Sequence, residues 1–167
     1  MRRRNCKRCR LLGVTLALTL CLTAGSSQAA DLVIDDYTYT LDSDVSFNNL
    51  YIGKVSTGAL NQTGGTNTVG GTLFLGFNSG TSGTYSLSGG IFSTGFGFVG
   101  YQGHGVFNQS GGISNIGYNL QLGFSSGSSG TYNLSGGSPA PLILFLEHQN
   151  IQGTVHSYII CQSNPRI

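Results

Sequence analysis

Charged residues are scarce in this chain, and its long central part has none. Between Val55 and Leu146 the sequence contains no Asp, Glu, Lys or Arg, and His104 is the only side chain there that titrates near neutral pH. General acid–base catalysis needs a positioned pair of titratable groups, and polysaccharide hydrolysis normally uses two carboxylates. The central part therefore lacks the residues for either kind of catalysis. His104, which lies between two glycines, is interpreted as a solvated turn residue.

Basic residues are concentrated at the N-terminus instead. Six of the eight Lys and Arg residues fall within residues 2–10, an apolar run follows from Leu11 to Ala24, and a Ser-Gln-Ala sequence at 27–29 suits cleavage. This order is typical of a secretory signal peptide, and a run of about 14 residues is short for a membrane span. We predict a signal peptide over residues 1–29, no membrane span in the mature chain, and a secreted or cell-surface location. A signal anchor is the alternative.

Cysteine and positive charge are both scarce after that segment. Only Cys161 of the four cysteines lies beyond it, so no internal disulfide is expected. The residues after position 29 carry six acidic and two basic side chains, a net charge of −4. Nucleic-acid binding needs a basic face. The mature chain is therefore not expected to bind nucleic acid.

What the chain has in abundance is an internal repeat of 47 residues. Residues 58–65 (GALNQTGG) return as 105–112 (GVFNQSGG), and residues 83–90 (GTYSLSGG) return as 130–137 (GTYNLSGG). The two segments are similar to each other, so each repeat holds two halves of about 23 residues. A unit of this size cannot bury a core by itself and must stack on its neighbours.

The apolar residues of each half alternate with a period of two, which is typical of half-buried strands. We predict an all-β fold, a parallel β-solenoid (β-helix) of about four coils with about 23–24 residues each, paired into the 47-residue repeat. Its handedness stays open. The turns between strands are expected at Gly53, Gly64, Gly65, Gly76, Gly89, Gly90, Gly100, Gly111, Gly112, Gly123, Gly136 and Gly137.

Stacking of equivalent residues predicts three inward rows and one outward or corner row. The inward rows are Ile52, Leu75, Val99 and Leu122, then Leu60, Tyr85, Phe107 and Tyr132, then Gln62, Leu87, Gln109 and Leu134. The outward or corner row is Asn61, Ser86, Asn108 and Asn133. The alternation of Gln and Leu explains why the period is two coils. The glutamines either are buried against turn carbonyls or lie exposed at a corner.

Residues 30–49 are predicted to form an N-terminal lead-in or cap, and residues 50–137 the solenoid repeats. Five aspartates gather in the lead-in, where charge would keep another chain from adding to the open edge. A calcium site is the alternative, although these aspartates lack the glycine-punctuated loop and closing glutamate of such sites. No metal or cofactor is expected.

Residues 138–167 are interpreted as a degenerate fifth coil followed by an atypical tail. Phe145 stands 47 residues after Phe98, so a fifth coil is predicted to begin in register there. Gly153 is aligned with Gly105 by adding one residue, and the pattern breaks near Asn150. The tail is either a genuine cap or the product of a truncation or frameshift.

The alternating GTYxLSGG and GxFNQSGG segments, with LxLG between them, resemble the repeats of large bacterial secreted proteins over about residues 47–150. These are the autotransporter-associated β-strand-repeat and PEP-CTERM-type surface proteins. The resemblance implies a β-helical stalk at the surface or in the matrix of a Gram-negative cell, and no catalytic residues. No C-terminal β-barrel or Val-Pro-Glu-Pro anchor of the family follows the repeats, so the means of anchoring stays open. Because the repeat breaks off in the tail, the chain is expected to be a truncated fragment.

Taken together, these observations predict a non-catalytic secreted or surface-exposed structural or interaction protein, adhesin- or matrix-like. Its expected partners are other copies of the chain or a polysaccharide or cell-surface matrix. Two alternatives stay open: a carbohydrate-binding module, and a non-catalytic fragment of a larger β-helical enzyme. In the first alternative Tyr101 and Tyr118 stack on sugars, with Phe77 and Phe124 close to the same turns. The same rings could instead cover the corners of the coils.

Overall fold

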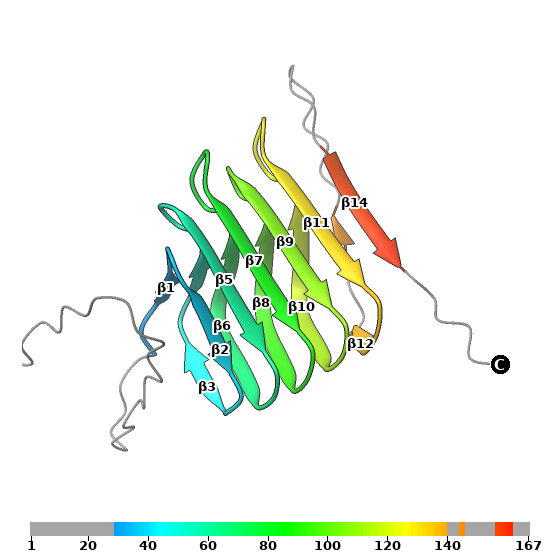
Figure 1. Ribbon diagram of the computed structural model, residues 1–167. Helices are drawn as coiled ribbons and strands as arrows, with labels where there is room; N and C mark the ends of the chain where they lie inside the picture. Colours follow the sequence, from blue (N-terminus) through cyan, green and yellow to red (C-terminus); the bar gives the residue numbers. More distant parts are fainter. Residues whose placement is uncertain (1–28, 140–143, 146–155, 162–167) are drawn as a thin grey trace, which may run out of the picture.

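The computed structural model describes residues 29–139, 144–145 and 156–161, which contain strands and no helix. The strands stack into a parallel β-solenoid of about four turns, which confirms the predicted fold class. Figure 1 shows successive strands of one sheet side by side in chain order, from blue at β2 to red at β14. Residues 1–28, and with them most of the predicted signal peptide, lie outside the described part.

Two parallel sheets make up the solenoid. Sheet A contains β1 (Leu32–Ile34), β4 (Leu50–Ile52), β6 (Thr66–Leu75), β8 (Ile91–Val99), β10 (Ile113–Leu122) and β12 (Ser138–Pro139), with β3 (Val45–Phe47) on β6 and β13 (Leu144–Phe145) on β10. Sheet B contains β2 (Thr38–Leu41), β5 (Thr57–Gln62), β7 (Ser82–Leu87), β9 (His104–Gln109), β11 (Ser129–Leu134) and β14 (His156–Cys161). Each coil therefore advances by one strand spacing, about 4.8 Å.

The register of sheet A follows the repeat. Leu50 pairs with Leu73, Leu73 with Gly97, and Gly97 with Leu120, in steps of 23, 24 and 23 residues. The first step, from Leu32 to Leu50, is only 18 residues. The lead-in thus forms a shortened first coil whose strands β1, β2 and β3 pair with β4, β5 and β6.

The long strands of sheet A turn a corner of the coil without breaking. The pairing register shifts between Val69 and Thr72 in β6 and between Ile116 and Asn119 in β10. At the same place the intervening strand, β8, has a single residue, Gly95. These extra residues form bulges, which bend a strand sharply. Each β6, β8 or β10 strand therefore supplies two sides of the solenoid, and sheet B supplies the third.

The predicted inward rows are confirmed. Two of them are buried throughout: Ile52, Leu75, Val99 and Leu122, and Leu60, Tyr85, Phe107 and Tyr132. In the third, Leu87 and both glutamines are buried, whereas Leu134 is partly exposed. A further buried row, Asn67, Phe92 and Ser114, lies on the corner-turning strands and was not predicted.

The buried glutamines are satisfied inside the solenoid. Gln62 Nε2 donates to the turn carbonyl of Gly65 at 3.2 Å and to the carbonyl of Ile91, at the start of β8, at 3.0 Å, while its Oε1 accepts a hydrogen bond from the hydroxyl of Tyr85. Asn67 Nδ2 in turn donates to that hydroxyl at 3.0 Å. Of the two alternatives for the glutamines, the structure thus shows burial against turn carbonyls.

The same arrangement recurs two coils later. Gln109 Nε2 donates to the carbonyl of Gly112 at 3.3 Å, and its Oε1 accepts from Ser114 Oγ at 2.8 Å and from the Tyr132 hydroxyl. A coil that carries a buried glutamine and the next coil, which carries the tyrosine bonded to it, therefore form one unit. This contact gives a physical reason for a repeat of two coils rather than one.

Glycines lie at the turns where backbones of adjacent coils meet. Those with positive φ include Gly53, Gly65, Gly76, Gly90, Gly100, Gly112, Gly123 and Gly137. Gly83 has an ordinary φ, yet a Cβ placed there would lie 2.0 Å from the carbonyl oxygen of Ile52. The corner thus has no room for a side chain at Gly83.

The C-terminal part confirms one expectation and corrects another. Phe145 pairs with Gln121, which pairs with Phe98, so a fifth coil does begin in register. The alignment of Gly153 with Gly105 is wrong, because β14 places Ser157 in that row, opposite Gly130. Backbone pairing with β11 sets the register of β14. The connection before β14 is longer than the one before β9, so a later residue takes the place equivalent to Gly105. Residues 146–155 and 162–167, where the pattern was expected to break, lie outside the described part.

Candidate functional site

Aromatic rings gather on the outer side of sheet A. Leu50 and Ile52 point into the core, so Tyr51 between them points out, and the same alternation holds along β6 and β8. We call the following eight residues the aromatic face: Tyr51, Phe74, Phe98, Phe77, Tyr101, Phe124, Phe96 and Tyr118. Phe96, Tyr118 and Phe124 are exposed and the other five rings are half-buried. A contiguous apolar surface of this kind marks an interaction site on many proteins. The aromatic face is therefore the candidate functional site.

Six of these rings form two adjoining columns along the solenoid axis. In the first, Phe74 stacks between Tyr51 and Phe98, with centroids 5.0 and 5.3 Å away. In the second, Tyr101 stacks between Phe77 and Phe124, with centroids 5.1 and 5.0 Å away. Edge-to-face contacts join the columns, such as the 5.3 Å contact between Phe98 and Tyr101 at 82°.

Lys54 begins the second column, because it follows Gly53 as Phe77 follows Gly76. Its Nζ lies 4.3 Å from the ring centroid of Tyr51, a cation–π contact. Each aromatic pair contributes about 0.5–1.5 kcal/mol beyond its buried area. The columns thus stabilise the outer surface of the turns as well as forming a patch.

The two predicted sugar-stacking residues lie in different settings. Both ring faces of Tyr101 are covered, one by Phe77 and the other by Phe124, so only ring edges reach the surface. This arrangement is the one expected of a residue that covers a coil corner. A sugar that stacks on a ring needs an open ring face, and Tyr101 does not offer one.

Tyr118 is the more accessible of the two. It is 64% exposed at the bulge of β10, and one face stacks on Phe96 at 4.9 Å. Gly95 makes room for this ring, since a Cβ there would lie 3.3 Å from Tyr118 Cδ2. Tyr118 therefore remains a candidate for ligand stacking.

The outer side of sheet B has a different chemistry. Its outward rows are Thr38, Ala59, Thr84, Val106 and Thr131, and Thr40, Asn61, Ser86, Asn108 and Asn133. The second contains the expected asparagine row, and within it Asn133 Nδ2 donates to Asn108 Oδ1 at 2.7 Å. We call this side the hydroxyl–amide face. The solenoid thus has one aromatic and one small polar outer face.

His104 lies in one row with Thr57, Ser82 and Ser129, as the first residue of β9 and not as the turn residue interpreted from the sequence. It is exposed, and its Nδ1 lies 2.7 Å from Ser129 Oγ. A serine nucleophile needs a histidine that is itself oriented by a third group. No hydrogen bond to such a group is found among the described residues, so the pair is a surface contact.

The aspartates of the first coil bind backbone N–H groups of the second. Asp35 Oδ1 accepts from the N–H groups of Lys54 at 2.6 Å and Val55 at 3.2 Å, and Asp44 accepts from Thr66 at 2.7 Å. Asp31 accepts from the side chain of Asn49 at 3.0 Å and from its backbone N–H at 3.1 Å. Within the described residues, no group of three His, Cys, Asp or Glu is placed to hold a metal ion.

The surroundings of Tyr85 and Asp31 shift the pKa of each side chain. Burial raises the pKa of Tyr85 well above its usual value, although its hydrogen bond from Asn67 opposes the shift. Slight desolvation acts to raise the pKa of the exposed Asp31, but the hydrogen bonds from Asn49 and Asn48 outweigh it and lower that pKa. Both groups are structural.

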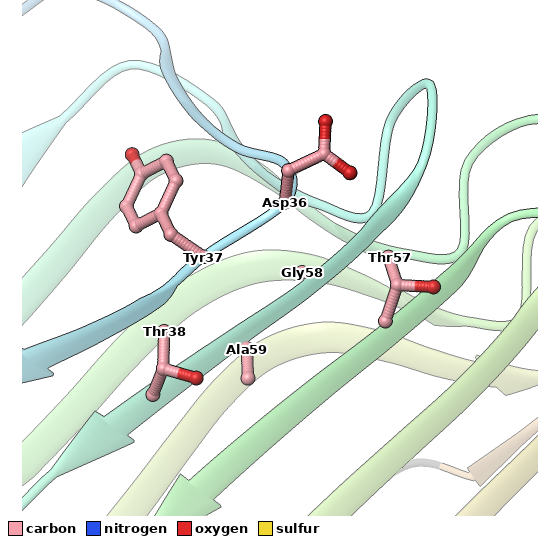
Figure 2. Close-up of a pocket in the computed structure, with 6 residues that line it drawn as sticks. All are labelled: Asp36, Tyr37, Thr38, Thr57, Gly58 and Ala59. Carbon is pink, nitrogen blue, oxygen red and sulfur yellow. The ribbon is translucent and has the colours of Figure 1, made fainter. Parts of the chain in front are cut away.

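A shallow depression lies at the N-terminal end of sheet B. It is lined by Asp36, Tyr37, Thr38, Thr57, Gly58 and Ala59 and holds about 280 Å³. Figure 2 shows the Asp36 carboxylate and the Tyr37 ring pointing in different directions. The volume is at the lower limit of ligand pockets, and no pair of groups converges on it.

The aromatic face was only partly predicted from the sequence. Tyr101, Tyr118, Phe77 and Phe124 were singled out, but Tyr51, Phe74, Phe98 and Phe96 were not. A usable pattern was present: an aromatic residue precedes the last inward residue of three successive coils, at steps of 23 and 24 residues. Recognising it as a surface required the outward alternation of sheet A.

Comparisons with protein-family models, with curated proteins and with solved structures find no match. Among the described residues, no helix is long and apolar enough to cross a membrane.

Proposed function

We propose that this chain is a non-catalytic structural or interaction protein, a β-helical stalk displayed outside the cell. The observation that supports this best is the contrast between its two outer faces, one aromatic and one of hydroxyl and amide groups. Such a rod offers partners a continuous surface, and its coils hold no charged residue between Val55 and the end of β11. The similarity of its repeats to those of autotransporter-associated and PEP-CTERM-type surface proteins supports the same role.

The cell surface is the place to test this proposal. The full chain would be expressed in a Gram-negative host with an epitope tag at its C-terminus, and intact cells would be treated with a protease. We expect loss of the tag from intact cells and an N-terminus shortened by about 29 residues, as the basic and apolar leader predicts. Full-length protein that stays protected until the cells are lysed would contradict the proposal.

Carbohydrate binding is a second candidate, and the exposure of Tyr118 favours it. One face of this ring stacks on Phe96, and the side chain is 64% exposed. Affinity electrophoresis in a panel of neutral polysaccharides would test it. Tyr118→Ala should weaken retardation about tenfold, whereas Tyr37→Ala, another exposed tyrosine on the first coil, should leave it unchanged. Equal effects, or no retardation, would contradict this second function.

A further inference from the structure

We propose that the aromatic face binds the aromatic face of a second copy of this chain, with the two solenoid axes antiparallel. This inference rests on the proposed role as an interaction protein and names its partner. The hydroxyl–amide faces would then point outward on both sides of the pair.

The exposed apolar residues indicate which side is the interface. Among the described residues, the large apolar side chains classed as exposed are Val33, Tyr37, Val55, Ile91, Phe96, Ile113, Tyr118 and Phe124. Phe96 and Tyr118 lie at or beyond the bend of β8 and β10, Phe124 follows β10 directly, and Val33 pairs beside Tyr51, so these four side chains lie on or next to the aromatic face. Ile91 and Ile113 precede the bend and lie on another side of the solenoid. Four of the eight exposed apolar side chains are therefore gathered on the side of the aromatic face.

The size of the face fits a weak dimer. From Phe96 to Tyr101 the chain spans about 17 Å, and four strands span about 19 Å along the axis, so the face covers roughly 300 Å². This is the size of the largest apolar patch on a typical monomer, and such patches are often functional. A stable pair typically buries about 800 Å² on each partner. Dimerisation through this face should therefore depend strongly on concentration.

Ring orientation favours a protein partner over a sugar. The two columns hide their ring faces against one another and leave edges at the surface, as at Tyr101. A flat surface of ring edges can pack against another apolar sheet, because sheets pack face to face about 10 Å apart. It offers no row of open ring faces on which a polysaccharide chain could stack.

Charge selects the antiparallel arrangement. Lys54 is the only Lys or Arg among the described residues and lies at the N-terminal end of the face. Parallel pairing would bring two Lys54 side chains together, whereas antiparallel pairing places each one towards the partner's Phe124, which is 42% exposed. A two-fold pair of this kind closes on itself and stops at two copies.

Sedimentation velocity of the full chain, from about 10 μM to about 1 mM, tests the proposal. Wild type should shift from monomer to dimer across this range. The double variant Tyr118→Lys with Phe124→Lys should remain monomeric, because it adds charge to the face. The control, Ser88→Lys with Ser110→Lys, adds the same charge at exposed positions just beyond sheet B and should dimerise as wild type does.

Circular dichroism would establish that each variant is folded. If the double variant does not fold, Tyr118→Lys alone serves, because that side chain is already largely exposed. Wild type that stays monomeric, or dimers equally weakened in the control, would overturn the inference. A continuing series of trimers and larger species insensitive to the lysines would also overturn it, since it would indicate end-to-end pairing of strands. Surface exposure on cells is scored separately, so either proposal can fail alone.

Discussion

The rings of Tyr101 and Phe124 lie 5.0 Å apart and within 5° of parallel. They come from equivalent positions, each directly after a turn glycine of successive coils. The spacing matches the advance of one coil, about 4.8 Å, so the backbone pairing brings the rings to stacking distance without further adjustment. The aromatic columns are thus a direct product of the repeat.

Truncation of a ring inside the column should cost more than truncation at its end. Tyr101 stacks on Phe77 and Phe124 and meets the edges of Phe74 and Phe98, while Phe124 meets only Tyr101 and Phe98 in the described part. Tyr101→Ala should lower the free energy of unfolding by about 3 kcal/mol, and Phe124→Ala by about 1 kcal/mol. Urea denaturation measures both, and equal losses would show that the column does not act as a stack.

Close backbone packing predicts a second contrast, between two glycines. A Cβ at Gly83 would lie 2.0 Å from the carbonyl oxygen of Ile52, whereas at Gly117 the nearest atom, the carbonyl oxygen of Thr94, is 3.8 Å away. Neither glycine has positive φ, so conformational strain is matched. Gly83→Ala should destabilise the protein by about 3 kcal/mol or prevent folding, and Gly117→Ala should change stability by less than about 1 kcal/mol. Thermal denaturation of both variants would show a similar loss if the corner had room for a methyl group.

The buried hydroxyl of Tyr85 predicts an alkaline transition. Burial raises its pKa above the usual 10.0. Its contribution to stability is therefore fully present below pH 10 and is lost as the pH rises above it, because the unfolded chain ionises first. In Tyr85→Phe this alkaline loss should shrink.

Tyr85→Phe should also cost about 1–3 kcal/mol at neutral pH, because Gln62 loses a donor and Asn67 an acceptor. The ring itself should fit, since Phe107 occupies the same row in the next coil. Tyr118→Phe, at an exposed position, is the control and should follow wild type. Urea titrations from about pH 7 to about pH 11 give the comparison, and identical alkaline slopes in all three proteins would contradict the assignment.

The inward rows could be predicted because a parallel solenoid converts sequence spacing directly into position. Leu60, Tyr85 and Phe107 share an offset within the repeat, and strand pairing places them in one row. The Gln–Tyr contact that makes the period two coils required side-chain geometry, since Gln62 could equally have faced a corner.

The corner and the tail show where spacing alone fails. The bulges after Val69 and Ile116 add a residue in alternate coils, so pairing steps beside them differ from those of the rest of sheet A. In the tail, Gly153 matched Gly105 by residue type, but hydrogen bonding along β11 selected Ser157. A glycine match identifies a turn and does not by itself determine strand register.

The first coil predicts an acid-dependent loss of stability. Asp31 is exposed, and its slight desolvation is outweighed by the hydrogen bonds from Asn49 and Asn48, so its pKa lies below the ordinary 3.8. A carboxylate with a lowered pKa contributes stability above the ordinary value and loses it as the pH falls through the lowered one. Asp31→Asn should remove this dependence, at a cost near neutral pH of less than about 1 kcal/mol because the group is exposed.

Asp42→Asn is the control, since that carboxylate makes no hydrogen bond within the described residues. Urea unfolding at about pH 7 and about pH 2.5 should show a smaller difference in Asp31→Asn than in wild type or Asp42→Asn, and an unchanged difference would mean that Asp31 does not secure the first coil.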